Sequence, residues 1–136
     1  MSYIVVDASI FVSYLVSEDR FHVLCKNWLN KERSNDVILV SPSLMLVEVA
    51  GAISRRTGNS QLAERTIHSF NHLNGLRLVG MNQTLVEAGA ILATRLGLRG
   101  ADAIYVAVAQ ELNIPLATLD SDQRTRAANA VRIENL

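Results

Sequence analysis

Residues 99–120 read RGADAIYVAVAQELNIPLATLD, and this stretch decides the fold. Its first part, from Ala101 to Leu112, is an apolar segment of helical length that follows a turn at Gly100. Its second part, from Pro115 to Leu119, is a short apolar run of strand length that ends directly before Asp120. A helix followed at once by a strand without polar alternation is typical of an α/β protein whose strands are buried on both faces.

The same alternation of short and long apolar segments continues toward both ends of the chain. It predicts further strands at Tyr3–Val6, Val37–Ser41 and Leu76–Met81, and a short closing strand at Val131–Ile133. Helices are predicted over residues 8–16, 20–33, 42–57, 60–74, 82–96 and 120–130, with Pro42 in the first turn of its helix. We therefore expect a parallel sheet of four to five strands with helices on either side.

The composition limits the class of protein. A chain of 136 residues with 49% apolar and 19% charged residues predicts one folded domain, residues 1–136. The lone cysteine, Cys25, excludes an internal disulfide and favours a core position in a cytoplasmic protein. The apolar run near the N-terminus is interrupted by Asp7 and is too short to span a membrane. Thirteen basic residues balance thirteen acidic ones, so the chain has no overall basic field.

Four carboxylates occupy unusual positions. Asp7 and Asp120 each follow a predicted strand directly, where the carboxyl ends of parallel strands meet at one edge of a sheet. Glu48 and Asp102 each interrupt a strongly apolar helix, where an uncompensated charge is costly. Simpler roles are open for each: Asp7 and Asp120 as helix N-caps, the latter in a capping box with Gln123, and Asp102 at a helix N-terminus. For Glu48 the simpler role is a strained pairing with Arg55 or Arg56, seven and eight residues further on.

A common cause for all four is a site that gathers carboxylates around a divalent cation. Oxygen ligands without His or Cys select Mg²⁺ or Mn²⁺, and these ions support hydrolysis of phosphodiesters. Ser9 and Thr118 each lie two residues from a strand-end acid and could orient a carboxylate, although a serine and a threonine are ordinary there. Asp122 could be a peripheral ligand or could only interact with the helix dipole.

The strings VVDASIFVSYL, SPSLMLVEVAGAI, RGADAIYVAVAQELNIPLATLD and SDQRTRA resemble, in order and spacing, the PIN-domain nucleases, and most closely the VapC ribonuclease toxins of VapBC toxin–antitoxin pairs. The resemblance covers the whole chain, although residues 56–95 match only in their element pattern. It implies that Asp7, Glu48, Asp102 and Asp120 form the acidic metal site, with Ser9 and Thr118 in support.

The resemblance also implies a three-layer α/β/α sandwich and Mg²⁺- or Mn²⁺-dependent cleavage of RNA. Its further implications are a homodimer and an antitoxin that masks the site. Two alternatives stay open: a PIN nuclease of RNA maturation or decay, and a catalytically silent module that binds RNA or protein.

Outside the acidic positions the sequence offers less specific signals. The candidates for contact with RNA phosphates are Arg55, Arg56, Arg95 and Arg99. His68 and His72 have the spacing of a metal-binding pair but are expected on the surface, because the glutamate of an H-E-x-x-H motif is absent. The apolar residues of the first two helices are expected in the core or at a partner surface: Phe11, Tyr14, Leu15 and Trp28.

Overall fold

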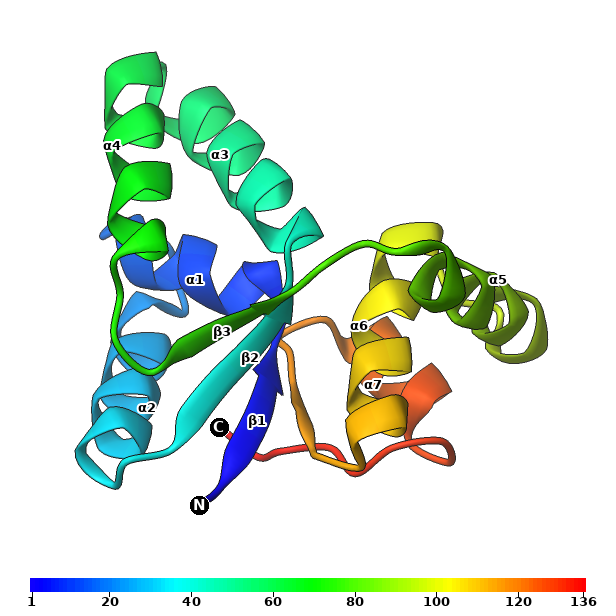
Figure 1. Cartoon of the computed structure of the whole chain (residues 1–136). Helices are drawn as coiled ribbons and strands as arrows, with labels where there is room; N and C mark the ends of the chain where they lie inside the picture. Colours follow the sequence, from blue (N-terminus) through cyan, green and yellow to red (C-terminus); the bar gives the residue numbers. More distant parts are fainter.

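The computed structural model describes all 136 residues and contains four strands and seven helices in alternation (Figure 1). The elements in chain order are β1 (Tyr3–Val6), α1 (Ala8–Leu15), α2 (His22–Ser34), β2 (Ile38–Pro42), α3 (Leu44–Thr57), α4 (Ser60–Asn71), β3 (Leu76–Val79), α5 (Gln83–Leu96), α6 (Gly100–Leu112), β4 (Leu116–Ala117) and α7 (Ser121–Ala127). None of these helices combines the length and the apolar content that a membrane crossing requires.

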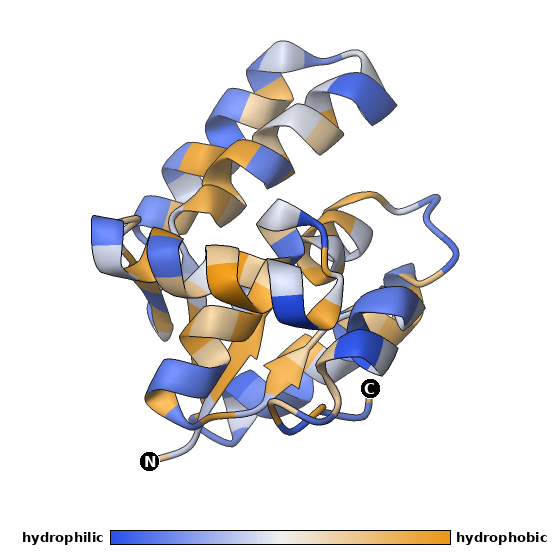
Figure 2. Ribbon diagram, turned by 90° about the vertical axis from the view of Figure 1, so that its right-hand side faces the viewer, coloured by the Kyte–Doolittle hydropathy of each residue, from blue (hydrophilic) through white to orange (hydrophobic).

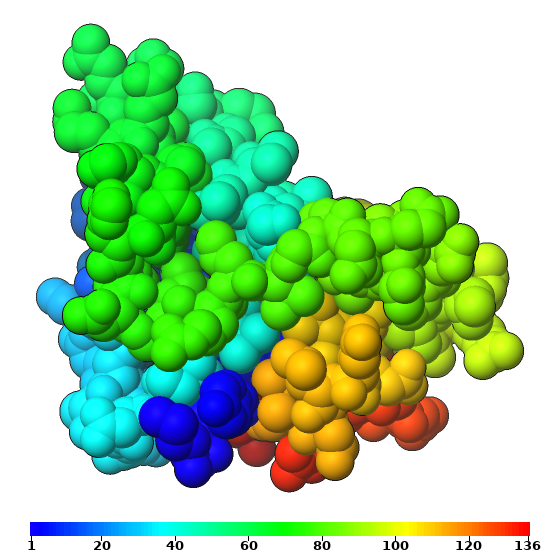
Figure 3. All heavy atoms as spheres, viewed as in Figure 1, coloured from blue at the N-terminus to red at the C-terminus, as the bar shows by residue number.

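The strands form one sheet in the order β3-β2-β1-β4, and every pairing in it is parallel. Figure 1 shows α1 to α4 on one side of this sheet and α5 to α7 on the other. The prediction of an α/β/α sandwich around a parallel sheet is therefore confirmed. The α3–α4 hairpin extends beyond the carboxyl ends of the strands, and in Figure 3 the molecular outline is hollowed between this hairpin and α5.

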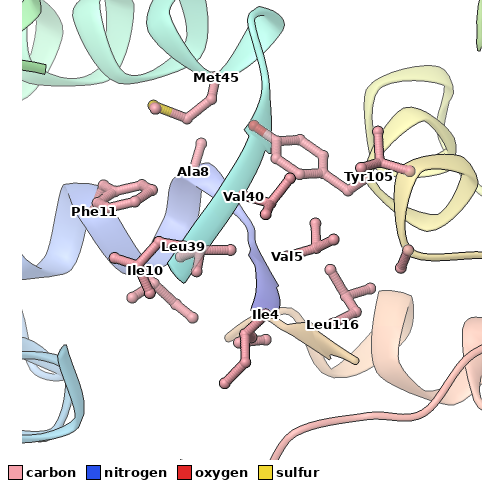
Figure 4. Close-up of a cluster of buried hydrophobic side chains, with 14 of the residues drawn as sticks. Ile4, Val5, Ala8, Ile10, Phe11, Leu39, Val40, Met45, Tyr105 and Leu116 are labelled. Carbon is pink, nitrogen blue, oxygen red and sulfur yellow. The ribbon is translucent and has the colours of Figure 1, made fainter. Parts of the chain in front are cut away.

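The core lies on both faces of the two central strands. Ile4 and Val5 of β1 and Leu39 of β2 are buried between Phe11 of α1 on one side and Tyr105 of α6 on the other (Figure 4). Burial on both faces explains why these strands carry no alternating polar residues. Figure 2 shows the result, with apolar strands surrounded by helices that carry both apolar and polar residues.

The prediction that Pro42 opens a helix is wrong. Pro42 is the last residue of β2 and pairs with Val79, and α3 follows from its N-cap, Ser43. The backbone N–H of Ser43 donates to the carbonyl of Val79 at 2.8 Å, so the pairing of β2 with β3 passes the proline without needing its missing N–H.

The predicted closing strand is reduced to one bridge between Ile133 and Leu116. Two backbone hydrogen bonds make it, from Leu116 N to Arg132 O and from Glu134 N to Leu116 O, both 2.9 Å. Because β4 is only two residues long, it offers no ladder on which a longer fifth strand could form. The neighbouring helix is also shorter than predicted, since α7 ends at Ala127.

Candidate active site

The four carboxylates come from four separate elements near the carboxyl ends of the central strands. Asp7 follows β1 and is the N-cap of α1, and Asp120 follows β4 and is the N-cap of α7. Because β1 and β4 are parallel neighbours, these two residues lie at the same edge of the sheet. Glu48 lies in α3 and Asp102 in the first turn of α6.

Hydrogen bonds hold three of these carboxylates in place. The backbone N–H of Ser9 donates to Asp7 Oδ2 at 3.0 Å, and that of Gln123 donates to Asp120 Oδ1 at 3.0 Å. The Tyr105 hydroxyl, which reaches from α6, donates to Glu48 Oε1 at 2.6 Å. Asp7 and Asp120 are thus N-caps, as the simpler interpretation expected, and N-capping does not prevent their free oxygens from serving a site.

The carboxylates destabilise one another's charge. Burial and then the negative charges of Asp7, Asp120 and Glu48 raise the pKa of Asp102 to about 6, against the opposing effect of Arg99. Burial also raises the pKa of Glu48, to which Asp7 adds, while the hydrogen bond from Tyr105 opposes it. These effects place the four side chains within one electrostatic neighbourhood.

Burial is likewise the main cause of the raised pKa of Asp7, which is 7% exposed. Hydrogen bonding from Ser9 opposes the rise, as does the nearby hydroxyl of Thr118, and the charge of Asp120 adds to it. The two ion pairs of the chain, Arg56–Asp19 and Arg126–Asp122, include none of the four acids. The group therefore carries negative charge that the protein itself leaves without an ion-pair partner.

This donor set fits a hard divalent cation. All four candidate ligands are carboxylates, and Mg²⁺ and Mn²⁺ prefer such oxygen ligands. In the structure, no three His, Cys, Asp or Glu side chains lie close enough together to hold a metal ion at once. Mutual repulsion of bare carboxylates favours such spacing, and a bound cation would remove the repulsion.

Three of the acids line a cleft of about 650 Å³, together with residues along α3 and at the start of α1. Arg55 and Arg56 line the same cleft, as does Asp19, whereas Asp120 lies outside its lining. Arg56 Nη1 donates to Asp19 Oδ1 at 2.9 Å, so this arginine is engaged.

Arg55 lies differently. A Cβ at Gly51 would lie only 3.2 Å from Arg55 Nη1, so the guanidinium folds back along α3 and lies beside Gly51. Of the other two candidate arginines, Arg99 precedes α6 and acts on Asp102, while Arg95 is exposed at the end of α5 and lies outside the cleft. The structure thus brings three of the four arginines near the acids and does not bring Arg95.

Of the three predicted supporting residues, two lie at the site and one lies away from it. Ser9 Oγ accepts a hydrogen bond of 3.3 Å from Leu119 N, which ties α1 to the end of β4. Thr118 is fully buried, and its Oγ1 accepts from Asp120 N at 3.1 Å. Asp122 instead accepts from Arg126 Nε at 2.8 Å on the exposed side of α7. Ser9 and Thr118 contact the site, and Asp122 does not.

Tyr105 and Gln123 contact the site although the sequence did not single them out as site residues. Tyr105 lies one helical turn after Asp102 and has the one hydroxyl group in the apolar segment of α6. A lone polar group in such a segment indicates a buried hydrogen-bond partner, so the sequence did contain a signal for this residue. For Gln123 the expected capping box is wrong in its second half. Its side chain does not bond the N–H of Asp120, which is taken by Thr118.

The residues with less specific signals lie on the surface, in the core and at a groove. His68 in the last turn of α4 and His72, its C-cap, are exposed, as expected, and Cys25 is fully buried. Phe11 and Trp28 are core residues, whereas Tyr14 and Leu15 line a small apolar groove of about 50 Å³ between α1, α2 and α4.

Solved structures with the same fold include several toxins and toxin–antitoxin complexes. Mycobacterium tuberculosis VapC20, described as a toxin that cleaves the sarcin–ricin loop, is 21% identical, with a TM-score of 0.79 over 97% of this chain and 99% of its own. VapBC2 from Rickettsia felis, bound to a DNA fragment of its promoter, is 17% identical, with a TM-score of 0.74 over 98% of both chains. FitAcB from Neisseria gonorrhoeae is 18% identical, with a TM-score of 0.68 over 97% of this chain and 96% of its own.

No curated protein matches the chain in sequence. The family model of the PIN domain does match, over residues 4–129. That range begins in β1, ends just after α7 and includes all four carboxylates. With the acids gathered at the carboxyl ends of a parallel sheet and the family model matching nearly the whole length, the chain belongs to the PIN domain family.

Proposed function

We propose that this protein is an endoribonuclease that requires Mg²⁺ or Mn²⁺ and hydrolyses RNA phosphodiester bonds. One observation carries the proposal: burial and neighbouring carboxylates raise the pKa values of Asp7, Glu48 and Asp102, and no cationic side chain forms an ion pair with these three acids or with Asp120. A protein keeps such a group, against its electrostatic cost, where a cation offsets the charge in the working state.

In this proposal the carboxylates have two roles, to bind the cation and to accept a proton from the attacking water. Asp7, Glu48, Asp102 and Asp120 would hold the cation, with Asp7 oriented by the Ser9 N–H and Glu48 by the Tyr105 hydroxyl. When bound, the cation supplies a Lewis acid that activates water and neutralises charge on the scissile phosphate. A carboxylate oxygen that is not bound to the cation can accept the proton that the attacking water loses.

Arg55 is the cleft arginine without an ion-pair partner, and it would contact a phosphate of the substrate. Arg56, which lines the cleft, and Arg99, whose charge acts on Asp102, are the next candidates for phosphate contact. Arg95 is the last, because it does not line the cleft and lies at the exposed end of α5. The net charge of zero makes this local group of arginines the main source of affinity for RNA.

We further propose that the protein is the toxin of a type II toxin–antitoxin pair, a homodimer whose partner is an antitoxin. The likeness to VapC20, VapBC2 and FitAcB supports this. The apolar groove between α1, α2 and α4 supports a protein partner, because Tyr14 and Leu15 remain partly exposed in it. The alternatives are a PIN nuclease of RNA maturation or decay and a silent binding module.

The test of the activity is cleavage of a mixed pool of tRNA, rRNA fragments and single-stranded RNA by the purified protein. We expect cleavage with Mg²⁺ or Mn²⁺, none in EDTA, and none by Asp7→Asn or Asp102→Asn. Asp122→Asn is the matched control and should cleave like the wild type, since Asp122 pairs with Arg126 away from the acids. Cleavage that persists in EDTA and in both variants refutes the proposal, and RNA bound without cleavage identifies a silent module.

The toxin role has a separate test in cells. Induced expression of the wild type should arrest growth, and expression of Asp7→Asn should not. If a small protein is encoded directly upstream, its co-expression should restore growth. Active enzyme that leaves growth unaffected would favour the role in RNA maturation or decay.

A further inference from the structure

Gln123 is a polar side chain with no exposed surface, in the first turn of α7. Both ends of its amide are used by the protein. Oε1 accepts from Thr118 Oγ1 at 2.8 Å, and Nε2 donates to the backbone carbonyl of Asp102 at 3.3 Å. Its backbone N–H donates to Asp120 Oδ1 at 3.0 Å. A buried amide whose oxygen and nitrogen are both hydrogen-bonded inside the protein is held in one orientation.

These bonds connect two carboxylate residues that the chain otherwise places on different helices. Asp102 lies in the first turn of α6, and Asp120 precedes α7. Through Gln123 the backbone at Asp102, the side chain of Asp120 and the hydroxyl of Thr118 become one network. Thr118 completes it by accepting from the N–H of Asp120 at 3.1 Å.

We propose that Gln123 is a positioning residue that fixes Asp102 and Asp120 relative to each other for a divalent cation. The proposal rests on the proposed metal-dependent function. Gln123 is not itself a ligand in it, because its Oε1 is already bonded to Thr118. Like charges on two separate helices move apart unless the scaffold holds them, and the Gln123 amide is the polar link between their two helices.

The network requires a donor and an acceptor on the same side chain. Glutamate keeps the acceptor for Thr118 but places an oxygen against the Asp102 carbonyl, where Gln123 donates. Methionine has nearly the same length and flexibility and provides neither strong bond. Gln123→Glu and Gln123→Met therefore remove different parts of the network with little change in volume.

The test is Mn²⁺ titration of the folded wild type and variants, followed by the electron paramagnetic resonance signal of free Mn²⁺. Matched controls are Gln110→Glu and Gln110→Met, since Gln110 is exposed on α6. We expect both Gln123 variants to bind Mn²⁺ about 10- to 100-fold more weakly and both Gln110 variants to bind like the wild type. A merely structural role would lower the melting temperature and leave the affinity of the folded protein unchanged.

A second readout needs no metal. Amide hydrogen exchange should speed up at Asp120 and at residue 123 in Gln123→Met, and not in Gln110→Met. Wild-type affinity for Mn²⁺ in a folded Gln123 variant overturns the proposal, as does unchanged exchange at both amides. If Gln123→Met does not fold, Gln123→Glu decides by the same two measurements. A wild type that binds no Mn²⁺ overturns the proposed function instead, and the exchange comparison then decides the role of Gln123.

Discussion

Asp102→Asn should make the metal-free protein more stable at neutral pH while it abolishes activity. The pKa of Asp102 rises from 3.8 to about 6 on folding, mainly through burial and then through the charges of Asp7, Asp120 and Glu48. A rise of that size corresponds to about 3 kcal/mol at 1.36 kcal/mol per pKa unit. Because the side chain is partly exposed, solvent screening reduces this to about 1–2 kcal/mol.

The substitution also has a cost. Asp102 lies in the first turn of α6, and loss of its interaction with the helix dipole removes about 0.5 kcal/mol. The relief of repulsion is larger, so we expect a net gain of about 1 kcal/mol in the free energy of unfolding in EDTA at pH 7.5. For a chain of this size the melting temperature should rise by about 3 °C.

The gain should depend on pH with a defined sign. The unfolded pKa is the lower one, so protonation of Asp102 stabilises the wild type fully below pH 3.8, and this stabilisation is lost as the pH rises through about 6. The variant carries no such titration. The difference in unfolding free energy should therefore be small near pH 4 and reach its full value by pH 7.5.

Urea unfolding of wild type and variant in EDTA, at several pH values, measures this difference. Asp122→Asn, with its exposed carboxylate paired to Arg126, is the control and should change stability by less than about 0.5 kcal/mol. A variant less stable than the wild type at pH 7.5, or a difference independent of pH, would refute the electrostatic reasoning. Added Mn²⁺ should reverse the order by stabilising the wild type more.

Three further predictions concern single side chains. Tyr105→Phe removes the 2.6 Å hydrogen bond to Glu48 and should cost about 1–2 kcal/mol in urea unfolding, whereas unchanged stability would show that the bond contributes nothing. Arg55→Ala should weaken RNA binding and lower the slope of log Kd against log salt by about 1. Arg56→Ala should change the slope less, because the Arg56 guanidinium is already in an ion pair with Asp19, and equal effects would contradict the different roles of the two arginines. The Cys25 thiol is fully buried and its pKa is raised to about 11, so iodoacetamide at pH 8 should modify it only after denaturation, and rapid modification of the native protein would contradict this burial.

Much of the fold could be predicted from the sequence because its strands are buried on both faces. An uninterrupted apolar run such as Tyr3–Val6 is too short for a helix and fits a buried strand, and the acids that follow two of these runs mark where the strands end. The sequence does not determine the place of Pro42, because a proline suits the start of a helix as well as the end of a strand. Only the pairing of β2 with β3 distinguishes the two. The closing strand was overestimated because the length of β4 depends on tertiary contacts.

The candidate site shows a similar division. Asp7, Glu48, Asp102 and Asp120 stood out because a carboxylate in an apolar context needs a reason. Gln123 is expected from the sequence only as a capping-box residue, because glutamine in the first turn of a polar helix is ordinary, and its contact with α6 joins residues 21 positions apart. Arg95 could not be separated from Arg55 in the sequence, since both are basic residues in the last turn of a helix.

The place of β4 in the sheet has a consequence for synthesis on the ribosome. β4 pairs with β1, so Ala117 lies beside Val6 although more than a hundred residues separate them in the chain. A nascent chain that has emerged only as far as α6 contains three of the four carboxylates but neither β4 nor Asp120. If the protein is the ribonuclease that we propose and needs Asp120, we therefore expect catalytic competence only late in translation.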